Sequence, residues 1–290
     1  MNHLVEIQSV SQIFRVGFWR KKFQALDDVS FTLNQGEVLG LVGPNGAGKT
    51  TLIHLLVGLK DPAAGQILVD GRSVREPSGR EKIGYLPERP YFYEHLTGRQ
   101  FLELFGKLSR MKGGQISERI PNVLGQVGLN YAIDTKLRNY SKGMLQRIGI
   151  AQALLHNPEF LILDEPMSGL DPQGRKEIRE IILGLRKKQK TILFSSHVIS
   201  DVEMICDQVL FLKKGRIMKY GPIGEILGND AREYEIGFIE KTPNTEWKNF
   251  PHLIDWRMTP DGMLMTRIKS ENRSVQEFLA LLMKNSAEIG

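Results

Sequence analysis

The sequence predicts an α/β protein with a mostly parallel sheet and a small α+β extension at its C-terminal end. Short apolar runs such as 38–42 and 160–163 are typical of strands that are buried on both faces of a sheet. Helical segments and polar turns separate these runs, which is the order that a parallel sheet covered by helices requires. The pattern changes after about Gly228, so we expect a main domain over residues 1–228 and the extension over residues 229–290.

The first part of the main domain is predicted to be an antiparallel β subdomain. Residues 3–34 alternate between apolar and polar side chains, and this period of two is typical of half-buried strands. Residues 38–42 form the first fully apolar strand, and a helix is expected from about Lys49 to Val57. Further strands are expected at 65–71, 82–86, 160–163 and 191–194, with a hairpin over 209–219.

Residues 95–157 differ from the rest of the main domain because apolar residues recur there at helical spacing. Phe101, Leu102, Phe105 and Leu108 indicate one helix, and two more are indicated around residues 120 and 150. We therefore expect a helical insertion within the α/β domain.

The composition of the 290-residue chain is that of an ordinary folded protein, with 41% hydrophobic and 25% charged residues. No apolar run approaches the roughly 18 residues of a membrane span, and the N-terminus lacks the pattern of a signal peptide. Cys206 is the only cysteine, which excludes an intrachain disulfide and fits a reducing compartment. The net charge of +6 is compatible with nucleic acid, an anionic membrane surface or no special partner. The densest basic cluster, at 18–23, indicates either a contact with lipid headgroups or a solvated turn.

Residues 43–50 read GPNGAGKT and match the phosphate-loop pattern G-x-x-x-x-G-K-[ST] in full. The loop follows an apolar strand and opens a helix, which is the context that the pattern requires. Its glycines let backbone N–H groups turn toward phosphate oxygens, and the helix N-terminus favours negative charge. Lys49 would reach the β- and γ-phosphates, and the Thr50 hydroxyl would bind Mg²⁺. The residues expected to bind the nucleotide here are Gly43, Pro44, Asn45, Gly46, Ala47, Gly48, Lys49, Thr50 and Thr51.

Two carboxylates follow the apolar strand 160–163, at the strand end expected to lie beside the phosphate loop. Asp164 would hold Mg²⁺ through water, and Glu165 would polarise the attacking water as a general base. Burying two acids at a strand end is unfavourable unless they face a cation, so we interpret the pair as part of a phosphate-loop NTPase core. His197 follows the strand 191–194 at the same edge and would donate a hydrogen bond to the γ-phosphate.

With these motifs in place, the order and spacing of several short segments become informative. GPNGAGKT, YSKGMLQR at 140–147, FLILDEP at 160–166, SGLDP at 168–172 and SSH at 195–197 occur together. In this combination the chain resembles the ATP-binding subunit of an ABC transporter over roughly residues 3–225. The resemblance implies an ATPase that uses ATP and Mg²⁺, and the segments YLPE and SKGM are similar to the exporter-like (ABC-2 type) branch.

The segment YSKGM stands where this family has its Leu-Ser-Gly-Gly-Gln signature. The resemblance implies that Ser141 and Gly143 bind the γ-phosphate of ATP held by a second subunit. Tyr140, Lys142 and Met144 depart from the signature, and Lys142 would add a cation near the triphosphate. Asp171 matches the loop that couples the two sites across the dimer.

Two further positions follow from the resemblance. Glu88 stands where the family usually has Gln, and it is expected to contact Mg²⁺ through water. An aromatic residue near the N-terminus stacks on adenine in the family. Phe14 is our choice for this role, with Phe23 as the alternative.

The resemblance also implies partners and a location. Two copies would pair head to tail around two ATP molecules, so a second ABC ATPase subunit, most simply a second copy, is expected. Residues 88–100, which include three aromatic residues, would receive a helix of an integral membrane permease. The alternative is that these aromatic residues pack the helical insertion. The expected location is cytoplasmic, on the inner face of the cell membrane through the permease, and no nucleic acid is expected.

Two other classes of protein compete with this interpretation. One is a non-transport ABC ATPase that acts on ribosomes or nucleic acid, but those relatives usually carry two cassettes or a long coiled coil. This chain has one cassette and no sustained heptads. The other class is a phosphate-loop kinase or switch, which would leave YSKGM and SGLDP without a role.

Overall fold

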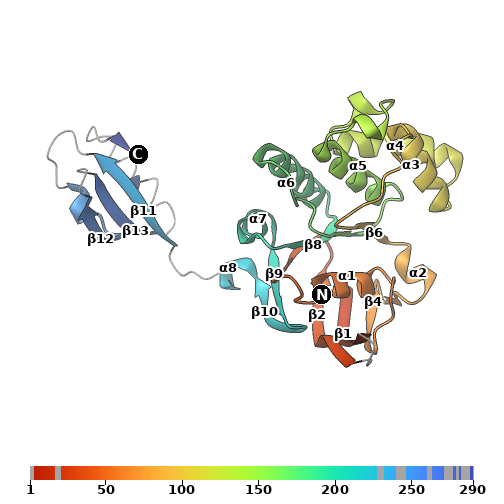
Figure 1. Ribbon diagram of the computed structural model, residues 1–290, viewed down its shortest axis with the longest axis horizontal. Coiled ribbons are helices and arrows are strands. Elements are labelled where there is room, and N and C mark those ends of the chain that lie inside the picture. Colours follow the sequence, from red (N-terminus) through yellow and green to blue (C-terminus); the bar gives the residue numbers. More distant parts are fainter. Residues whose placement is uncertain are drawn as a thin grey trace. The chain divides into compact units, whose positions relative to one another are not determined.

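The computed structural model of the chain describes residues 3–16, 21–226, 232–239, 246–259, 263–270, 277–278, 281 and 288–289. The chain divides into two compact units, Met1–Ile226 and Leu227–Gly290, which are described separately (Figure 1). Residues 18–20 of the basic cluster at 18–23 lie outside the described residues.

A six-stranded sheet forms the centre of the first unit, with its strands in the order β10-β9-β3-β8-β7-β6. Strands β9, β3, β8, β7 and β6 run parallel, and β10 is antiparallel to β9. Every residue of β3, β7 and β8 is buried, because helices and the second sheet cover both faces. The predicted α/β fold is confirmed. The strands are β3 (Val38–Val42), β6 (Ile83–Leu86), β7 (Phe160–Leu163), β8 (Thr191–Ser196), β9 (Gln208–Lys213) and β10 (Arg216–Pro222).

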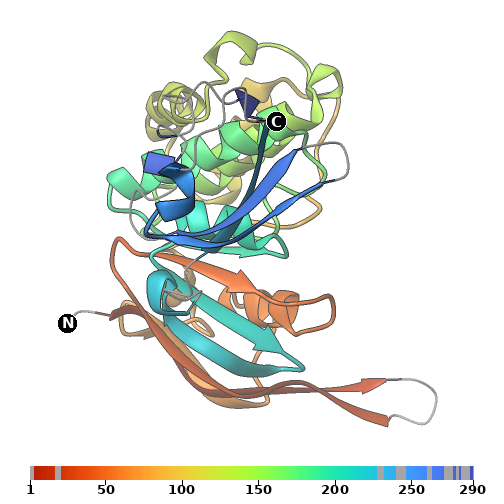
Figure 2. The ribbon, with the colours of Figure 1, turned by 90° about the vertical axis from the view of Figure 1, so that its left-hand side faces the viewer.

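A second, antiparallel sheet comes mainly from the N-terminal part of the chain, in the order β2-β1-β4-β5. Figure 2 shows β1 and β2 continuing as a long two-stranded ribbon beyond the other strands. The inward side chains of β2 share one apolar cluster with Leu39 of β3 and Leu52 of α1, so the two sheets enclose that helix. The elements are β1 (His3–Val16), β2 (Lys21–Asn34), α1 (Lys49–Leu56), β4 (Ala64–Val69) and β5 (Arg72–Ser73).

The helical insertion consists of α3 (Gly98–Leu108), α4 (Gly113–Gln126) and α5 (Lys142–Leu154), which lie together in Figure 1. Thr97 starts α3 with a capping box, in which its hydroxyl accepts from the Gln100 N–H and its own N–H donates to the Gln100 side chain. Helix α6 (Pro172–Lys187) was not among the predicted elements, although Ile178, Ile182 and Leu185 bury one face of it at helical spacing. Shorter helices are α2 (Pro77–Arg80), α7 (Ile199–Ile205) and α8 (Ile223–Ile226).

The second unit contains a four-stranded antiparallel sheet in the order β12-β13-β11-β14. Its core gathers Phe238, Trp247, Leu264, Ile268 and Phe278. Its strands are β11 (Arg232–Ile239), β12 (Leu253–Met258), β13 (Leu264–Ser270) and β14 (Glu288–Ile289). Among the helices of the described ranges, none is both long and apolar enough to cross a membrane.

Candidate functional site

The phosphate loop connects β3 to α1 and requires glycine at several of its positions. Gly48 has φ 110 and immediately precedes α1, so its backbone lies where side-chain-bearing residues are strained. A Cβ at Gly43 would lie 2.3 Å from the carbonyl oxygen of Leu212, and one at Gly48 would lie 2.7 Å from that of Ala25. The loop therefore lies tightly against its neighbours, and its free face is left to the backbone N–H groups at the start of α1.

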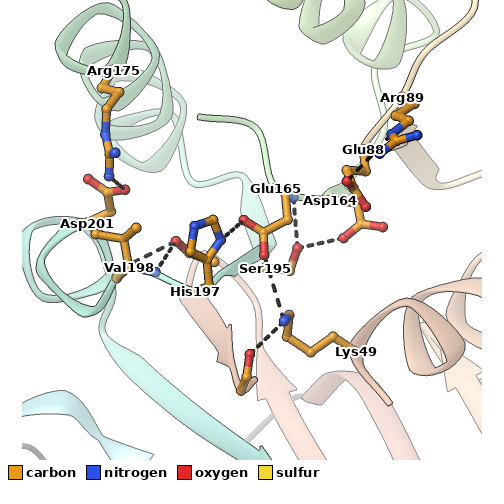
Figure 3. Close-up of polar contacts among 12 residues, drawn as sticks. Lys49, Glu88, Arg89, Asp164, Glu165, Arg175, Ser195, His197, Val198 and Asp201 are labelled. Atoms are coloured by element: carbon orange, nitrogen blue, oxygen red, sulfur yellow. Dashed lines mark hydrogen bonds and ion pairs between the residues drawn. The ribbon is translucent and has the colours of Figure 1, made fainter. Parts of the chain in front are cut away.

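The Lys49 side chain folds back across the loop. Its ammonium donates a 2.6 Å hydrogen bond to the carbonyl of Gly43 and lies 3.8 Å from Oε1 of Glu165 (Figure 3). The residue is 7% exposed, and a buried ammonium needs partners of this kind. Lys49 is thus held at the mouth of the loop, where phosphate oxygens can replace these contacts.

Asp164 follows β7 directly and is buried. Its N–H donates to the carbonyl of Leu86 at 2.9 Å, and its carboxylate accepts a 2.6 Å hydrogen bond from the Ser195 hydroxyl. Burial raises the pKa of Asp164, the Ser195 hydrogen bond opposes this, and the charges of Glu88 and Glu165 add to the rise in pKa. A carboxylate in this position gains from a nearby cation, so Asp164 suits a Mg²⁺ site.

Glu165 has a backbone conformation that is unusual for a residue with a side chain. Its φ is 48, in the left-handed region, and its N–H donates a 2.8 Å hydrogen bond to the Ser195 hydroxyl oxygen. This conformation turns the side chain toward His197, whose Nδ1 lies 2.9 Å from Oε2 of Glu165 (Figure 3). The Glu165 side chain is 13% exposed and that of His197 is 59% exposed. The carboxylate is therefore held between Lys49 and His197 at the edge of the pocket.

Ser195 is a site residue that the sequence analysis missed. It is fully buried in β8 and joins the two carboxylate residues, donating to Asp164 and accepting from the Glu165 N–H. The signal for Ser195 in the sequence is the polar pair Ser195 and Ser196 at the end of an apolar strand, directly before His197.

These groups surround one pocket with a volume of about 360 Å³. Its lining includes eight consecutive residues of the phosphate loop and α1, with carboxylates and an imidazole on the opposite side. The lining residues are Phe23, Ala25, Pro44, Asn45, Gly46, Ala47, Gly48, Lys49, Thr50, Thr51, Glu88, Asp164, Glu165, Ser168 and His197. The set combines phosphate-binding backbone, a cation, a hydroxyl and acids, which is the set that a triphosphate with Mg²⁺ requires.

The aromatic wall of this pocket comes from Phe23 and not from Phe14, which was our choice. Phe14 and Phe23 are opposite each other in the ladder between β1 and β2. The Lys60 ammonium lies 4.5 Å from the centre of the Phe14 ring, whereas Phe23 lines the pocket and is 52% exposed. The structure therefore favours Phe23, the alternative, as the residue available to a base.

Glu88 reaches the same pocket from the segment after β6. Its side chain is 46% exposed and lies 3.9 Å from the Arg89 guanidinium (Figure 3). Glu88 is a charged neighbour of Asp164, so two acidic side chains lie in the same part of the pocket. Such a pair favours a bound cation.

The remaining predicted site residues lie away from this pocket. Ser141 is the N-cap of α5, and its hydroxyl accepts from the Met144 N–H at 3.2 Å. Asp171 is the N-cap of α6, and its carboxylate accepts from the Gly174 N–H at 2.9 Å. Together with Gly143 they line a separate hollow of about 350 Å³. One chain thus presents two separate hollows, one with the phosphate loop and one with two helix N-termini.

Tyr140 has a structural role in the turn before α5. Its hydroxyl donates a 2.8 Å hydrogen bond to the carbonyl of Ala132, and the residue is 7% exposed. Burial is the main cause that raises the pKa of Tyr140 to about 12, and the charges of Tyr131 and Asp134 raise this pKa to a smaller extent. The side chain therefore anchors the turn before Ser141 to the helical insertion.

The comparisons with known proteins agree with this geometry. A family model described as ABC transporter matches residues 26–168. The chain is 47% identical to an ABC transporter ATP-binding protein of Nostoc, over 89% of this chain and 77% of that protein. It is 37% identical to the linearmycin resistance ATP-binding protein LnrL of Bacillus subtilis, over 70% of this chain and 67% of that protein.

A solved structure shows the same fold. It is a dimeric ATP-binding cassette in a post-hydrolysis state with ADP and inorganic phosphate bound, and it superposes with a TM-score of 0.68. The two sequences are 24% identical, and the match covers 76% of this chain and 99% of that one.

Proposed function

The chain belongs to the family of ABC transporter ATP-binding proteins, and on this basis we propose that it powers export through a membrane permease by ATP-driven pairing of two copies. As a member of this family it binds ATP with Mg²⁺ and hydrolyses it. The observation that carries the proposal is the separation of two half-sites on one chain. The phosphate-loop pocket contains neither Ser141, Gly143 nor Asp171.

The residues of the pocket fit both ligands. The backbone of the phosphate loop and Lys49 would bind the β- and γ-phosphates, and Phe23 would stack on adenine. Thr50, Asp164 and Glu88 would hold Mg²⁺, directly or through water. When bound, Mg²⁺ supplies positive charge that neutralises the phosphate oxygens.

Hydrolysis then depends on the groups that already converge on Glu165. The Glu165 carboxylate would accept a proton from the attacking water, and Ser195 holds the backbone at that point. A neutral imidazole has one N–H, so His197 donates either to Glu165, as the 2.9 Å contact allows, or to the γ-phosphate. We expect His197 to exchange the first contact for the second as charge develops on the γ-phosphate during hydrolysis.

Pairing of two copies would complete each site. The first turn of α5, at Ser141 and Gly143, faces outward. The N–H groups at a helix N-terminus favour an anion. In a head-to-tail pair these groups would meet the γ-phosphate on the second copy. ATP would then stabilise the pair because it binds the closed state better than the separate chains.

The coupling to transport is proposed for residues 88–100. Tyr91 is 80% exposed and Tyr93 is 40% exposed, with their rings in edge contact at 5.6 Å. Exposed aromatic residues are typical of partner surfaces, which supports docking of a permease helix and a location on the inner face of the membrane. Phe92, in contrast, packs against Phe101 of the helical insertion, so the alternative role applies to that residue.

Export is proposed because one relative, LnrL, is named for resistance to linearmycin. The alternative of a ribosome-acting or nucleic-acid-acting ATPase has no support in these comparisons. A vesicle assay with the chain and the membrane protein that co-purifies with it tests the direction. If the complex exports, ATP outside the vesicles drives uptake of the transported substrate into the lumen.

Pairing itself is tested with Glu165→Gln, which blocks hydrolysis and keeps ATP bound. We expect this variant to be monomeric without nucleotide and dimeric with ATP in analytical ultracentrifugation. Adding Ser141→Arg should remove dimerisation without removing ATP binding, because Ser141 lies outside the phosphate-loop pocket. A Glu165→Gln protein that binds ATP and stays monomeric would overturn the proposal.

A further inference from the structure

Arg147 and Glu177 join the two helices whose N-caps form the second half-site. Arg147 is the sixth residue of α5, which begins after Ser141, and Glu177 is the sixth residue of α6, which begins after Asp171. Arg147 Nε lies 3.6 Å from Glu177 Oε2. At about 1.5 Å of rise per residue, the pair connects both helices at the same depth, roughly 9 Å behind their caps.

The pair also separates two hollows. The hollow of about 350 Å³ on the cap side is lined by Ser141, Gly143 and Asp171. A second hollow of about 340 Å³ lies on the other side, beside the end of α4 and Glu180. Arg147 and Glu177 are the residues that line both. Because there is a hollow on each side of the pair, few packed atoms join α5 to α6 there, and the Arg147–Glu177 contact spans the gap between the two helices.

Arg147 is held by long contacts. One terminal nitrogen donates at 3.4 Å to the carbonyls of Val127 and Gly128, just after α4. Nε is buried and, within the described part of the chain, has no hydrogen-bond partner. A buried N–H without a partner is unfavourable, and a movement of roughly 0.7 Å toward Glu177 would give a charge-assisted hydrogen bond of ordinary length. Gln173 donates to the other Glu177 oxygen at 3.1 Å, so that carboxylate is already oriented.

We propose that Arg147 and Glu177 are positioning residues that set the separation between the N-cap of α5 and the N-cap of α6, so that the nucleotide on a second copy meets both. This inference rests on the proposed function, because it concerns the half-site that a second copy uses. Neither residue lines the phosphate-loop pocket. The pair therefore acts on pairing and leaves ATP binding by the single chain unchanged.

The test uses the full chain with Glu165→Gln as the parent and measures ATP-driven dimerisation by ultracentrifugation. Glu177→Gln removes the charge that faces Arg147. Glu180→Gln is the matched control, because it removes the same charge one turn further along α6 from the far hollow. We expect Glu177→Gln to weaken dimerisation about tenfold, equivalent to about 1.4 kcal/mol, and Glu180→Gln to change it by less than twofold.

Arg147 completes the test as a double-mutant cycle. Arg147→Gln should weaken dimerisation to the same extent as Glu177→Gln, and Arg147→Lys, which keeps the charge, should weaken it less. The double variant should be no weaker than the single ones, because coupled residues are not additive. ATP affinity of each monomer and its melting temperature are measured alongside, so that a folding defect is recognised by loss of both.

Three results would overturn the positioning role. Glu177→Gln could dimerise as well as Glu180→Gln, the two single effects could add in full, or the loss could appear in ATP affinity instead of dimerisation. A parent that binds ATP and stays monomeric gives a different result, because it overturns the proposed function and the positioning role with it.

Discussion

His197 Nδ1 lies 2.9 Å from Glu165 Oε2, so the expected general base and the expected γ-phosphate ligand contact each other directly. The contact predicts that His197 matters for the chemical step and not for holding ATP. His197→Ala should reduce ATP hydrolysis by about 10²–10³-fold, the typical loss for one transition-state hydrogen-bond donor.

Phosphate release measures that loss, and binding of a fluorescent ATP analogue gives the affinity, which should change by less than threefold. Glu165→Gln is the reference, with a loss of about 10²–10⁴-fold expected for a general base. Hydrolysis by His197→Ala at half the unaltered rate or more would contradict the assignment.

Asp164→Asn should stabilise the nucleotide-free protein at pH values above the pKa of Asp164. Burial raises that pKa, so the protonated form is favoured in the folded chain. The stability that this provides is present at low pH and is lost as pH rises through the raised pKa of Asp164. Asn carries no charge and keeps an oxygen that can accept from Ser195.

Thermal melting checks this prediction at pH 8 and at pH 4.5. Asp164→Asn should melt higher than the unaltered protein at pH 8, by about 2–4 °C for each kcal/mol regained, and the difference should shrink at pH 4.5. Mg²⁺ should then add more to the stabilisation by ATP in the unaltered protein than in Asp164→Asn. Equal differences at both pH values would mean that the charge of Asp164 is not the cause.

Phe23→Ala should weaken ATP binding more than Phe14→Ala does. Phe23 lines the pocket, whereas the Phe14 ring lies beside the Lys60 ammonium. Loss of one stacked aromatic ring corresponds to about 1–3 kcal/mol, so we expect roughly tenfold weaker binding for Phe23→Ala and less than twofold for Phe14→Ala. Titration calorimetry with ATP on both variants decides between the two phenylalanines, and GTP serves as a second ligand that shares the phosphates.

Tyr140→Phe should cost stability and leave hydrolysis intact. The hydroxyl donates to the Ala132 carbonyl in a buried position, and losing such a bond costs about 1 kcal/mol. With its pKa raised to about 12, the Tyr140 phenol stays protonated throughout the working range, so the pH profile of hydrolysis from 6 to 9 should not change. A variant with normal melting and lost activity would show that Tyr140 acts on the nucleotide instead.

The sequence sufficed for those parts of the site that lie within one local segment. The phosphate loop, Asp164 and Glu165 each follow an apolar strand, and a strand end in a parallel sheet has a predictable place. The choice between Phe14 and Phe23 needed the twist of the β1–β2 ribbon, because the two residues are directly paired and the sequence does not say which one turns toward the pocket.

Contacts between distant segments were also beyond the sequence. Ser195 lies 31 positions from Asp164. The sequence shows a polar pair at the end of an apolar strand, but not which residue of another strand this pair meets. Arg147 and Glu177 are 30 positions apart, and their meeting depends on how the helical insertion packs on α6. Side-chain periodicity predicts which face of a helix is buried, not which polar group on another helix it meets.

The left-handed backbone at Glu165 has a consequence for the engineering of this protein. With φ at 48, the backbone of this position suits Gly or Asn better than Glu. Holding Glu in this conformation costs about 1 kcal/mol or more of folding free energy. A search for thermostable variants that scored folding alone would therefore replace Glu165, the proposed general base, and would favour Asn over Asp one residue earlier. Heat resistance and turnover thus select different amino acids at the end of β7, and these two positions should be held fixed in any such search.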